Sequence, residues 1–178
     1  MRKRYLYVAI DRCSRYVHLA TYDAENAENA VDFLKAARAA FPFRVTHVLT
    51  DRGSCFTADA IEQACQDDGL DRRRTRAYSP QTNGMVERFN GRIATKVLPI
   101  NVANHADLEM LLRGFNQAYN QRRQRVLSGL SPASKVDERL KEKPRLRNQQ
   151  RKSVMEQSIR DAVDEIMIYA DDVSQPDS

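Results

Sequence analysis

The chain has 178 residues, of which 42% are hydrophobic and 30% are charged, and its formal net charge is +5. This length suits one compact domain with an extension, because domains usually hold about 100–150 residues. No apolar run approaches the ~20 residues that span a bilayer, and no cleavage site of a secretory signal follows the basic start. We therefore expect a cytoplasmic protein with no membrane partner.

The cysteines and histidines are scattered along the chain. The three cysteines are odd in number, and neither they nor the histidines have the paired spacing of a zinc site. We predict reduced thiols and no structural zinc. These residues are Cys13, Cys55, Cys65, His18, His47 and His105.

The first predicted elements are a hairpin and a helix. Tyr5–Ile10 and Tyr16–Thr21 are rich in aromatic and β-branched residues and are joined by a polar segment, which predicts a β-hairpin. Apolar residues then recur at helical spacing over Asn26–Phe41, and Pro42 stops the pattern, so an amphipathic helix is predicted there.

An alternation of strand, helix and strand is predicted next. Val45–Thr50 is mostly apolar, which is typical of a buried, parallel-type strand, and it ends at Asp51. We expect a helix capped by Thr57 and running to Cys65, with its end near Gly69. A short strand over Arg74–Ala77 completes the alternation, which indicates an α/β fold.

Helices dominate the next part of the chain. Ser79–Gly84 is dense in turn-forming residues, and a helix is predicted over Met85–Leu98 with Glu87 in its first turn. A second helix is predicted from Ala106 to Tyr119. Ser131-Pro132 is a favourable cap and first-turn pair for a third.

We divide the chain into a core over residues 1–140, a basic linker over 141–153, and a C-terminal amphipathic helix with a frayed end over 154–178. The basic segment is either a solvated linker or a nucleic-acid contact. The apolar stripe of the C-terminal helix needs a partner surface, and we expect it to dock on the chain's own core. The stripe consists of Met155, Ile159, Ala162, Val163, Ile166 and Tyr169.

Basic residues gather on either side of the predicted turn at Ser79–Gly84 and again after the second helix. If these clusters share one face, their distribution favours a phosphate-rich ligand, although a solvated face is the simpler interpretation of each cluster alone. The clusters are Arg72, Arg73, Arg74 and Arg76, then Arg88, Arg92 and Lys96, then Arg122, Arg123 and Arg125.

Two short segments carry the chemistry: Thr50–Phe56, which reads T-D-R-G-S-C-F, and Ser79–Gly91, which contains P-Q-T-N-G-M-V-E-R-F-N. Their acids, Asp51 and Glu87, have 35 residues between them. The segments resemble the T-D-N-G-S-x-F and P-Q-T-N-G-x-x-E-R-x-N segments of bacterial insertion-sequence transposases and retroviral-type integrases. The acid spacing of that family is known as D,D-35-E.

The resemblance implies a ribonuclease-H-like α/β core, in which helices flank a mixed central sheet. It also implies that Asp51 and Glu87 are catalytic ligands of Mg²⁺ or Mn²⁺, with two ions in a complete site. Two such ions stabilise charge on the attacking and leaving oxygens of a phosphodiester, and Mg²⁺ prefers carboxylate ligands. Taken singly, each acid is an ordinary loop or helix residue, but the joint spacing favours the ligand roles. The implied DNA-binding residues are Arg52, Arg74, Arg76, Gln81, Asn83, Arg88, Arg92 and Lys96.

The first acid of the family has no counterpart here. Residues 5–16 resemble the family's second strand, and the first acid lies on a strand roughly a dozen or more residues earlier. On this resemblance we expect an N-terminally truncated core that lacks its first strand. Asp11 is interpreted as a structural residue with Arg12 and Arg15 as ionic partners. Arg52 is a second departure, since the family usually has Asn there, and it places a positive charge beside Asp51 that lowers its pKa or competes with Mg²⁺.

Three functions follow from this interpretation. The first is a polynucleotidyl transferase core that cuts transposon ends and joins them to target DNA, as a homo-oligomer and with a third acid from outside this chain. The second is a non-catalytic remnant that binds DNA or pairs with intact transposase. The third is a nuclease for RNA–DNA hybrids, against which the Gln81–Asn90 motif argues.

Overall fold

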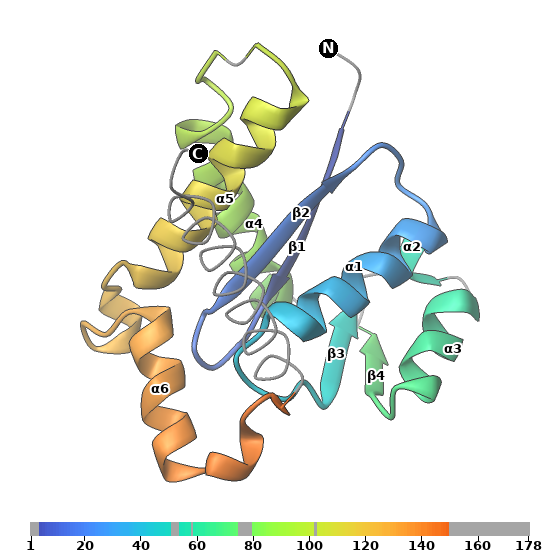
Figure 1. Ribbon diagram of the computed structural model, residues 1–178, viewed down its shortest axis with the longest axis vertical. Coiled ribbons are helices and arrows are strands. Elements are labelled where there is room, and N and C mark those ends of the chain that lie inside the picture. The colour runs from blue at the N-terminus through green and yellow to red at the C-terminus, as the bar shows by residue number, and fades with distance from the viewer. Residues whose placement is uncertain (1–3, 51–53, 58, 75–79, 102, 150–178) are drawn as a thin grey trace, which may run out of the picture.

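The fold was analysed in a computed structural model, in which the described residues form four strands in two separate two-stranded sheets, with helices packed around them (Figure 1). The structure describes residues 4–50, 54–57, 59–74, 80–101 and 103–149. Within these ranges no helix is long and apolar enough to cross a membrane.

The N-terminal hairpin pairs β1 (Tyr5–Ile10) with β2 (Val17–Tyr22) in antiparallel register, with Val8 opposite Leu19. This confirms the predicted hairpin. Alternate residues of each strand point to opposite faces, and both faces are covered by apolar side chains.

The turn of the hairpin is held by Asp11. Its Oδ2 accepts hydrogen bonds from the backbone N–H of Ser14 at 2.7 Å and from the Ser14 hydroxyl at 2.6 Å. Arg15 adopts a left-handed conformation with φ of 62° and closes the turn. The structural role of Asp11 is thus confirmed, but the expected ionic partners were wrong. Within the described part of the chain no ion pair joins Asp11 to Arg12 or Arg15.

Helices pack on both faces of the hairpin. One face contacts α1 (Ala27–Ala40), and the other contacts α4 (Pro80–Lys96) and α5 (His105–Gln121) (Figure 1). The core on the α1 side consists of Tyr7, Ala30, Phe33, Ala37, Phe41, Cys55, Ile61, Cys65 and Leu70. The core on the α4 and α5 side consists of Val17, Leu19, Phe89, Ile93, Val97, Leu112 and Tyr119.

The second sheet is a parallel pair. It joins β3 (His47–Thr50) to β4 (Asp71–Arg74), with Thr50 opposite Arg74. The strand predicted over Arg74–Ala77 therefore begins earlier than expected. The α/β alternation itself is confirmed.

Helical segments connect β3 to β4 on either side of residue 58, which lies outside the described residues. They are α2 (Ser54–Thr57) and α3 (Asp59–Asp67), and they include the described residues of the helix expected from Thr57 to Cys65. Gly69 follows α3 with φ of 63°, a left-handed conformation that a residue without Cβ adopts at little cost.

The expectation that β3 is buried was wrong. His47 and Leu49 are exposed, and Thr50 is the buried residue of this strand. The physical reason is that successive side chains point to opposite faces of the strand: Val48 packs on the core beside α1, whereas His47 and Leu49 belong to neither core cluster of the described residues.

Helix α4 begins earlier than predicted. The expected turn over Ser79–Gly84 is helical from Pro80 onward, which places Glu87 beyond the first turn. Proline is favourable at the start of a helix because its missing N–H has no intrahelical partner there. The helix dipole, whose effect is confined to the first turn, therefore gives Glu87 little support.

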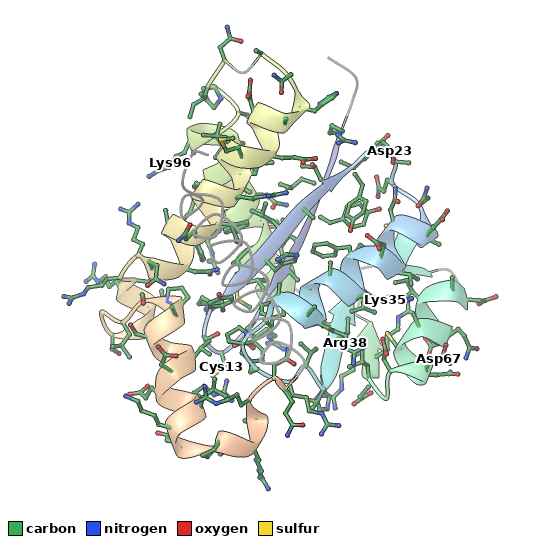
Figure 2. The ribbon with its side chains drawn as sticks, viewed as in Figure 1. Cys13, Asp23, Lys35, Arg38, Asp67 and Lys96 are labelled. Carbon is green, nitrogen blue, oxygen red and sulfur yellow. The ribbon has the colours of Figure 1, made fainter. Side chains whose placement is uncertain are left out.

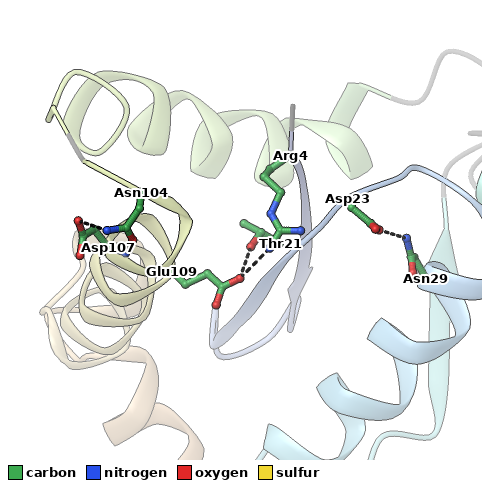
Figure 3. Close-up of polar contacts among 7 residues, drawn as sticks. All are labelled: Arg4, Thr21, Asp23, Asn29, Asn104, Asp107 and Glu109. Carbon is green, nitrogen blue, oxygen red and sulfur yellow. Dashed lines mark hydrogen bonds and ion pairs between the residues drawn. The ribbon is translucent and has the colours of Figure 1, made fainter. Parts of the chain in front are cut away.

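Helix α5 is hydrogen-bonded to β2 and to Arg4, the residue before β1. The Asn120 side chain accepts from the N–H of Val17 at 2.9 Å and donates to its C=O at 2.8 Å. On the same helix, Glu109 accepts from Arg4 at 3.2 Å and from the hydroxyl of Thr21 at 3.3 Å (Figure 3). These bonds fix α5 across the hairpin.

A 3₁₀ turn, η1 (Arg125–Leu127), leads from α5 to α6 (Pro132–Glu142). The Ser131 hydroxyl accepts from the backbone N–H of Ser134 at 3.1 Å, and Pro132 is the first helical residue. This confirms the predicted cap and first-turn pair.

The chain continues in contact with the core beyond α6. After the 3₁₀ turn η2 (Pro144–Leu146), the Asn148 side chain donates to the carbonyls of Arg38 at 2.8 Å and Phe41 at 2.9 Å, at the C-terminal end of α1. The expected basic linker therefore begins with residues that contact the core. Residues 150–178, including the expected C-terminal helix, lie outside the described residues.

Replacing Asn120 should destabilise the fold strongly. Asn120→Leu leaves the buried N–H and C=O of Val17 without partners, so we expect the free energy of unfolding to fall by about 2–4 kcal/mol. Urea unfolding followed by circular dichroism measures this. Gln121→Ala, at an exposed position of the same helix, is the control, and a similar loss in both variants would contradict the role of Asn120.

His18 should make stability depend on pH. Its ring stacks on Phe33 with centroids 5.7 Å apart, and burial lowers the pKa of His18. The unfolded chain therefore takes up the proton first, so the contribution of neutral His18 is complete above the ordinary pKa near 6.5 and is lost as the pH falls through that value.

His18→Phe keeps an aromatic ring and removes the proton. Its free energy of unfolding should decrease less than that of the wild type between about pH 7 and pH 5. Urea midpoints across this range give the comparison, with the exposed His47→Gln as the control. Parallel curves for the wild type and His18→Phe would contradict the expectation.

Candidate active site

A cavity of about 880 Å³ lies between the two sheets. Both β1 and β3 line it along their lengths, and they are not hydrogen-bonded to each other. Side chains of α1, α4 and α6 contribute to its walls. The cavity is thus the place where β3 and α4, which carry the two sequence motifs, meet.

Strand β3 brings the first motif to this cavity. Its last residue, Thr50, lines the cavity and is buried, and the Thr50 hydroxyl has no hydrogen-bond partner among the described residues. Asp51 follows directly in the sequence but lies outside the described residues. Because β3 and β4 are parallel, the residues that follow them emerge at the same edge of the sheet, where ligands bind in α/β proteins.

Helix α4 brings the second motif to the cavity. Glu87 is exposed and lines the cavity together with Asn90, three residues further along the helix. Among the described residues nothing forms an ion pair or hydrogen bond with the Glu87 carboxylate. A carboxylate in this state is a suitable oxygen ligand for a hard divalent cation.

The buried side of α4 holds Glu87 in place. Phe89, Ile93 and Val97, at helical spacing, are almost fully buried against the hairpin and α5. The Phe89 ring meets the ring of Tyr119 edge to face, with centroids 4.8 Å apart. This packing fixes the rotation of α4 about its axis and therefore the side on which Glu87 lies.

A second stripe on α4, which we call the basic stripe, consists of Arg88, Arg92 and Lys96. All three are exposed, and none lines the cavity. The Arg92 guanidinium lies 5.6 Å from the centre of the Tyr119 ring. Figure 2 shows Lys96 at the outer side of the molecule, away from β3. The structure therefore separates these cations from Glu87 by the buried stripe of the helix.

The other predicted site residues are placed only in part. Arg74 is the last residue of β4, and Gln81 and Asn83 belong to α4, but their side chains are not among the described atoms. Arg52 and Arg76, like Asp51, lie outside the described residues. Among the predicted catalytic and DNA-binding residues that the structure describes, Glu87 is the one that lines the cavity.

Two arginines of the cluster before α4 have structural partners. The Arg72 side chain is buried, forms an ion pair with Glu62 at 2.6 Å and donates to the carbonyl of Phe56. Arg73 forms an ion pair with Asp71 at 2.9 Å. These contacts tie both side chains to neighbouring parts of the fold, and neither residue is among the predicted DNA-binding residues.

The sequence interpretation did not single out Thr50, Asn90 or Asn120. Thr50 and Asn90 belong to the two motifs that carry the resemblance, so their positions within these motifs were the available signal. Asn120 lies outside both motifs. No local pattern reveals its bonds to Val17, which join residues 103 positions apart.

Glu87 supplies the one carboxylate among the described residues of the two motifs. Among the described residues no group of three His, Cys, Asp or Glu side chains lies close enough to hold a metal ion. The free thiols do not add to the site as soft ligands: Cys65 is fully buried, and burial raises the pKa of its thiol. The donors that fit a metal at the cavity are therefore carboxylates.

Comparison with known proteins now bears on this site. Two family models, each described as an integrase core domain, match residues 1–80 and 68–132. These matches support an integrase or transposase catalytic core. An uncharacterized protein of Caenorhabditis elegans is 24% identical over 129 residues, which cover 72% of this chain and 10% of that protein. The chain thus spans about a tenth of the length of this relative.

Both matched models are described as an integrase core, in agreement with the resemblance seen in the sequence. The mixed α/β structure is consistent with a ribonuclease-H-like integrase core. At this level the resemblance seen in the sequence is confirmed.

The basic stripe should contribute to DNA affinity. Replacing Arg88, Arg92 and Lys96 together by Ala should weaken binding to a short duplex and reduce the slope of log K against log salt by about 2–3, since each lost phosphate contact removes about 0.9. Fluorescence anisotropy over a salt series measures both quantities.

The matched control removes the same charge elsewhere. Lys35, Arg44 and Arg113 are exposed and lie outside α4 and outside the basic segment 141–153, so their joint replacement by Ala should leave the salt slope nearly unchanged. Equal losses in the two triple variants would show that net charge, and not the basic stripe, determines the affinity.

Proposed function

We propose that this integrase core cuts and joins DNA strands, acting on transposon ends and target DNA in the manner of a bacterial insertion-sequence transposase. The observation that carries the proposal is that Glu87 and the last residue of β3, Thr50, line one cavity, with Asp51 next in the chain. The two acids of the D,D-35-E pattern are thus led toward one place by two different elements.

The donors at this place fit Mg²⁺ or Mn²⁺. Glu87 offers a carboxylate free of partners among the described residues, and Asp51 offers a second carboxylate after β3. These two residues would hold the metal, with two ions in a complete site. When bound, the ions stabilise negative charge on the attacking and leaving oxygens of the phosphodiester.

The residues around the acids position the DNA. Arg88, Arg92 and Lys96 are solvent-exposed cations that suit the phosphate backbone, which is usually contacted by Arg and Lys. We assign further backbone contacts to Arg52, Arg74, Arg76, Gln81 and Asn83, which flank the two acids in the sequence. Arg52 also lies next to Asp51, where its charge favours the ionised carboxylate.

A second function is favoured by the split between the sheets. Because β1 and β3 are not hydrogen-bonded, the sheet that carries Asp51 is not joined directly to the hairpin. We also propose that catalysis needs a third acid from outside this chain and the first strand of the fold, which this core lacks. Without that acid and that strand, the chain would bind DNA, associate with itself or pair with intact transposase, and it would not catalyse strand transfer.

Glu87→Gln tests the metal site directly. Replacing the Glu87 carboxylate by an uncharged amide should weaken Mn²⁺ binding at least about 10- to 100-fold, because even residues that only support the ligands of a metal contribute that much to its affinity. Electron paramagnetic resonance of free Mn²⁺ gives the affinity, and strand transfer on short labelled duplexes gives the activity. Glu142→Gln, on the exposed side of α6, is the control.

The outcomes separate the two functions. Loss of both Mn²⁺ binding and strand transfer in Glu87→Gln alone supports the catalytic function. If the wild type binds Mn²⁺ and DNA but transfers no strand, the non-catalytic function is supported. Unchanged Mn²⁺ binding in Glu87→Gln would contradict the metal-ligand role itself.

A further inference from the structure

The loop between α5 and α6, which we call the arginine loop (residues 122–130), presents three arginines to solvent. Arg122, Arg123 and Arg125 are exposed, and among the described residues none of them forms an ion pair. None of them lines the cavity between the two sheets. The neighbouring sequence supplies no opposite charge, since residues 110–136 contain no Asp or Glu. These three cations are therefore suited to an anionic ligand.

The arginine loop has a fixed shape. The backbone N–H of Gln124 donates to the C=O of Leu130 at 2.9 Å, and that of Gly129 donates to the C=O of Gln124 at 3.1 Å. Leu127 is buried and anchors the middle of the loop, while Ser128 and Gly129 turn the chain back with positive φ. A ligand that binds here does not have to order the loop first, which lowers the entropic cost of binding.

Both ends of the arginine loop are attached to the core. Asn120, two residues before Arg122, is hydrogen-bonded to the backbone of Val17. Ser131, directly after the loop, caps α6. The loop thus has a fixed place at the outer edge of the molecule, on the far side of the hairpin from β3 and β4 (Figure 1). Binding residues on such a loop are positioned by the rigid elements around it.

The basic stripe of α4 leads to this loop across the end of α5. The Arg92 guanidinium lies 5.6 Å from the centre of the Tyr119 ring. Arg122 is the C-cap residue of α5, three residues after Tyr119, and its backbone N–H donates to the Tyr119 C=O at 3.2 Å. The axes of packed helices lie about 8–10 Å apart, which equals roughly three base pairs of duplex DNA at about 3.4 Å each. One duplex can therefore contact both groups of cations.

We propose that the arginine loop and the basic stripe form one continuous track that binds the phosphate backbone of a single DNA duplex. The inference rests on the proposed function, because that function assigns DNA binding to the basic stripe. Cations on two adjacent elements match a ligand whose negative charges repeat, and duplex DNA carries one charge per about 1.7 Å of its axis. Arginine suits the loop better than lysine would, because its planar guanidinium can donate two parallel hydrogen bonds to one phosphate.

The salt dependence of DNA binding tests this track. Replacing Arg122, Arg123 and Arg125 together by Ala should weaken the binding of the full chain to a short labelled duplex. It should also reduce the slope of log K against log salt by about 2–3, since each lost phosphate contact removes about 0.9. Fluorescence anisotropy over a salt series measures both quantities. Thermal melting followed by circular dichroism should be unchanged, because the three side chains are exposed.

Two further variants serve as controls. Replacing the same three arginines by Lys keeps their charge and should retain most of the salt slope, although the affinity should fall because the paired hydrogen bonds are lost. Replacing Arg12, Lys35 and Arg44 by Ala removes the same charge from exposed positions outside α4, α5 and the arginine loop. This variant should keep the wild-type slope.

One continuous track requires that both clusters contribute to one binding event. The inference is overturned if only one of the two Ala variants, that of the loop or that of the basic stripe, reduces the slope. It is also overturned if the charge control loses as much slope, because net charge would then determine binding. Titration of the wild type should give one duplex per chain, and two duplexes per chain would mean separate sites. If neither the loop nor the stripe variant changes the slope, the DNA-binding role of the stripe in the proposed function is wrong as well.

Discussion

The two hydrogen bonds from the Asn120 side chain to Val17 close the outer edge of the hairpin, where a neighbouring strand would otherwise bind. A single side chain here satisfies one backbone N–H and one C=O in a buried place, where leaving either unpaired is costly. The same helix carries Tyr119, on which Phe89 of α4 packs. The position of Glu87 therefore depends on a chain of contacts that begins at the edge of β2, on the far side of the hairpin from the cavity.

The opposite edge of the hairpin, formed by β1, faces the second sheet. Among the described residues, side chains of helix α1 and not a further strand connect the two sheets. Phe33 of α1 lies against Tyr7 of β1, with ring centroids 5.4 Å apart. At the other end of the helix, Arg38 forms an ion pair with Asp68, just after α3. Side-chain packing of this kind fixes distance and orientation but leaves the backbone groups of β1 and β3 unpaired. The cavity between the two sheets follows from that difference.

Local patterns in the sequence were sufficient wherever the structure is decided locally. The hairpin, α1 and the Ser131 cap depend on alternation, helical spacing and one hydroxyl, and all were predicted. The exposure of β3 was not, since burial of an apolar run depends on which strands lie beside it. The start of α4 at Pro80 was missed because residues typical of turns are also compatible with a first helical turn. For the site, spacing identified Glu87, but the ion pairs that occupy Arg72 depend on tertiary contacts.

Helix α4 separates opposite charges by the way it is packed. Glu87 and the basic stripe lie on opposite sides of the buried stripe of Phe89, and only Glu87 reaches the cavity. An arginine of α4 placed beside Glu87 would pair with the carboxylate and compete with any cation for it. The described arginines that line the cavity come from other parts of the chain, and none of them forms an ion pair with Glu87. A phosphate chain meets the basic stripe outside the cavity. The same apolar contacts that fold α4 onto the hairpin thus keep the two binding functions of one helix apart.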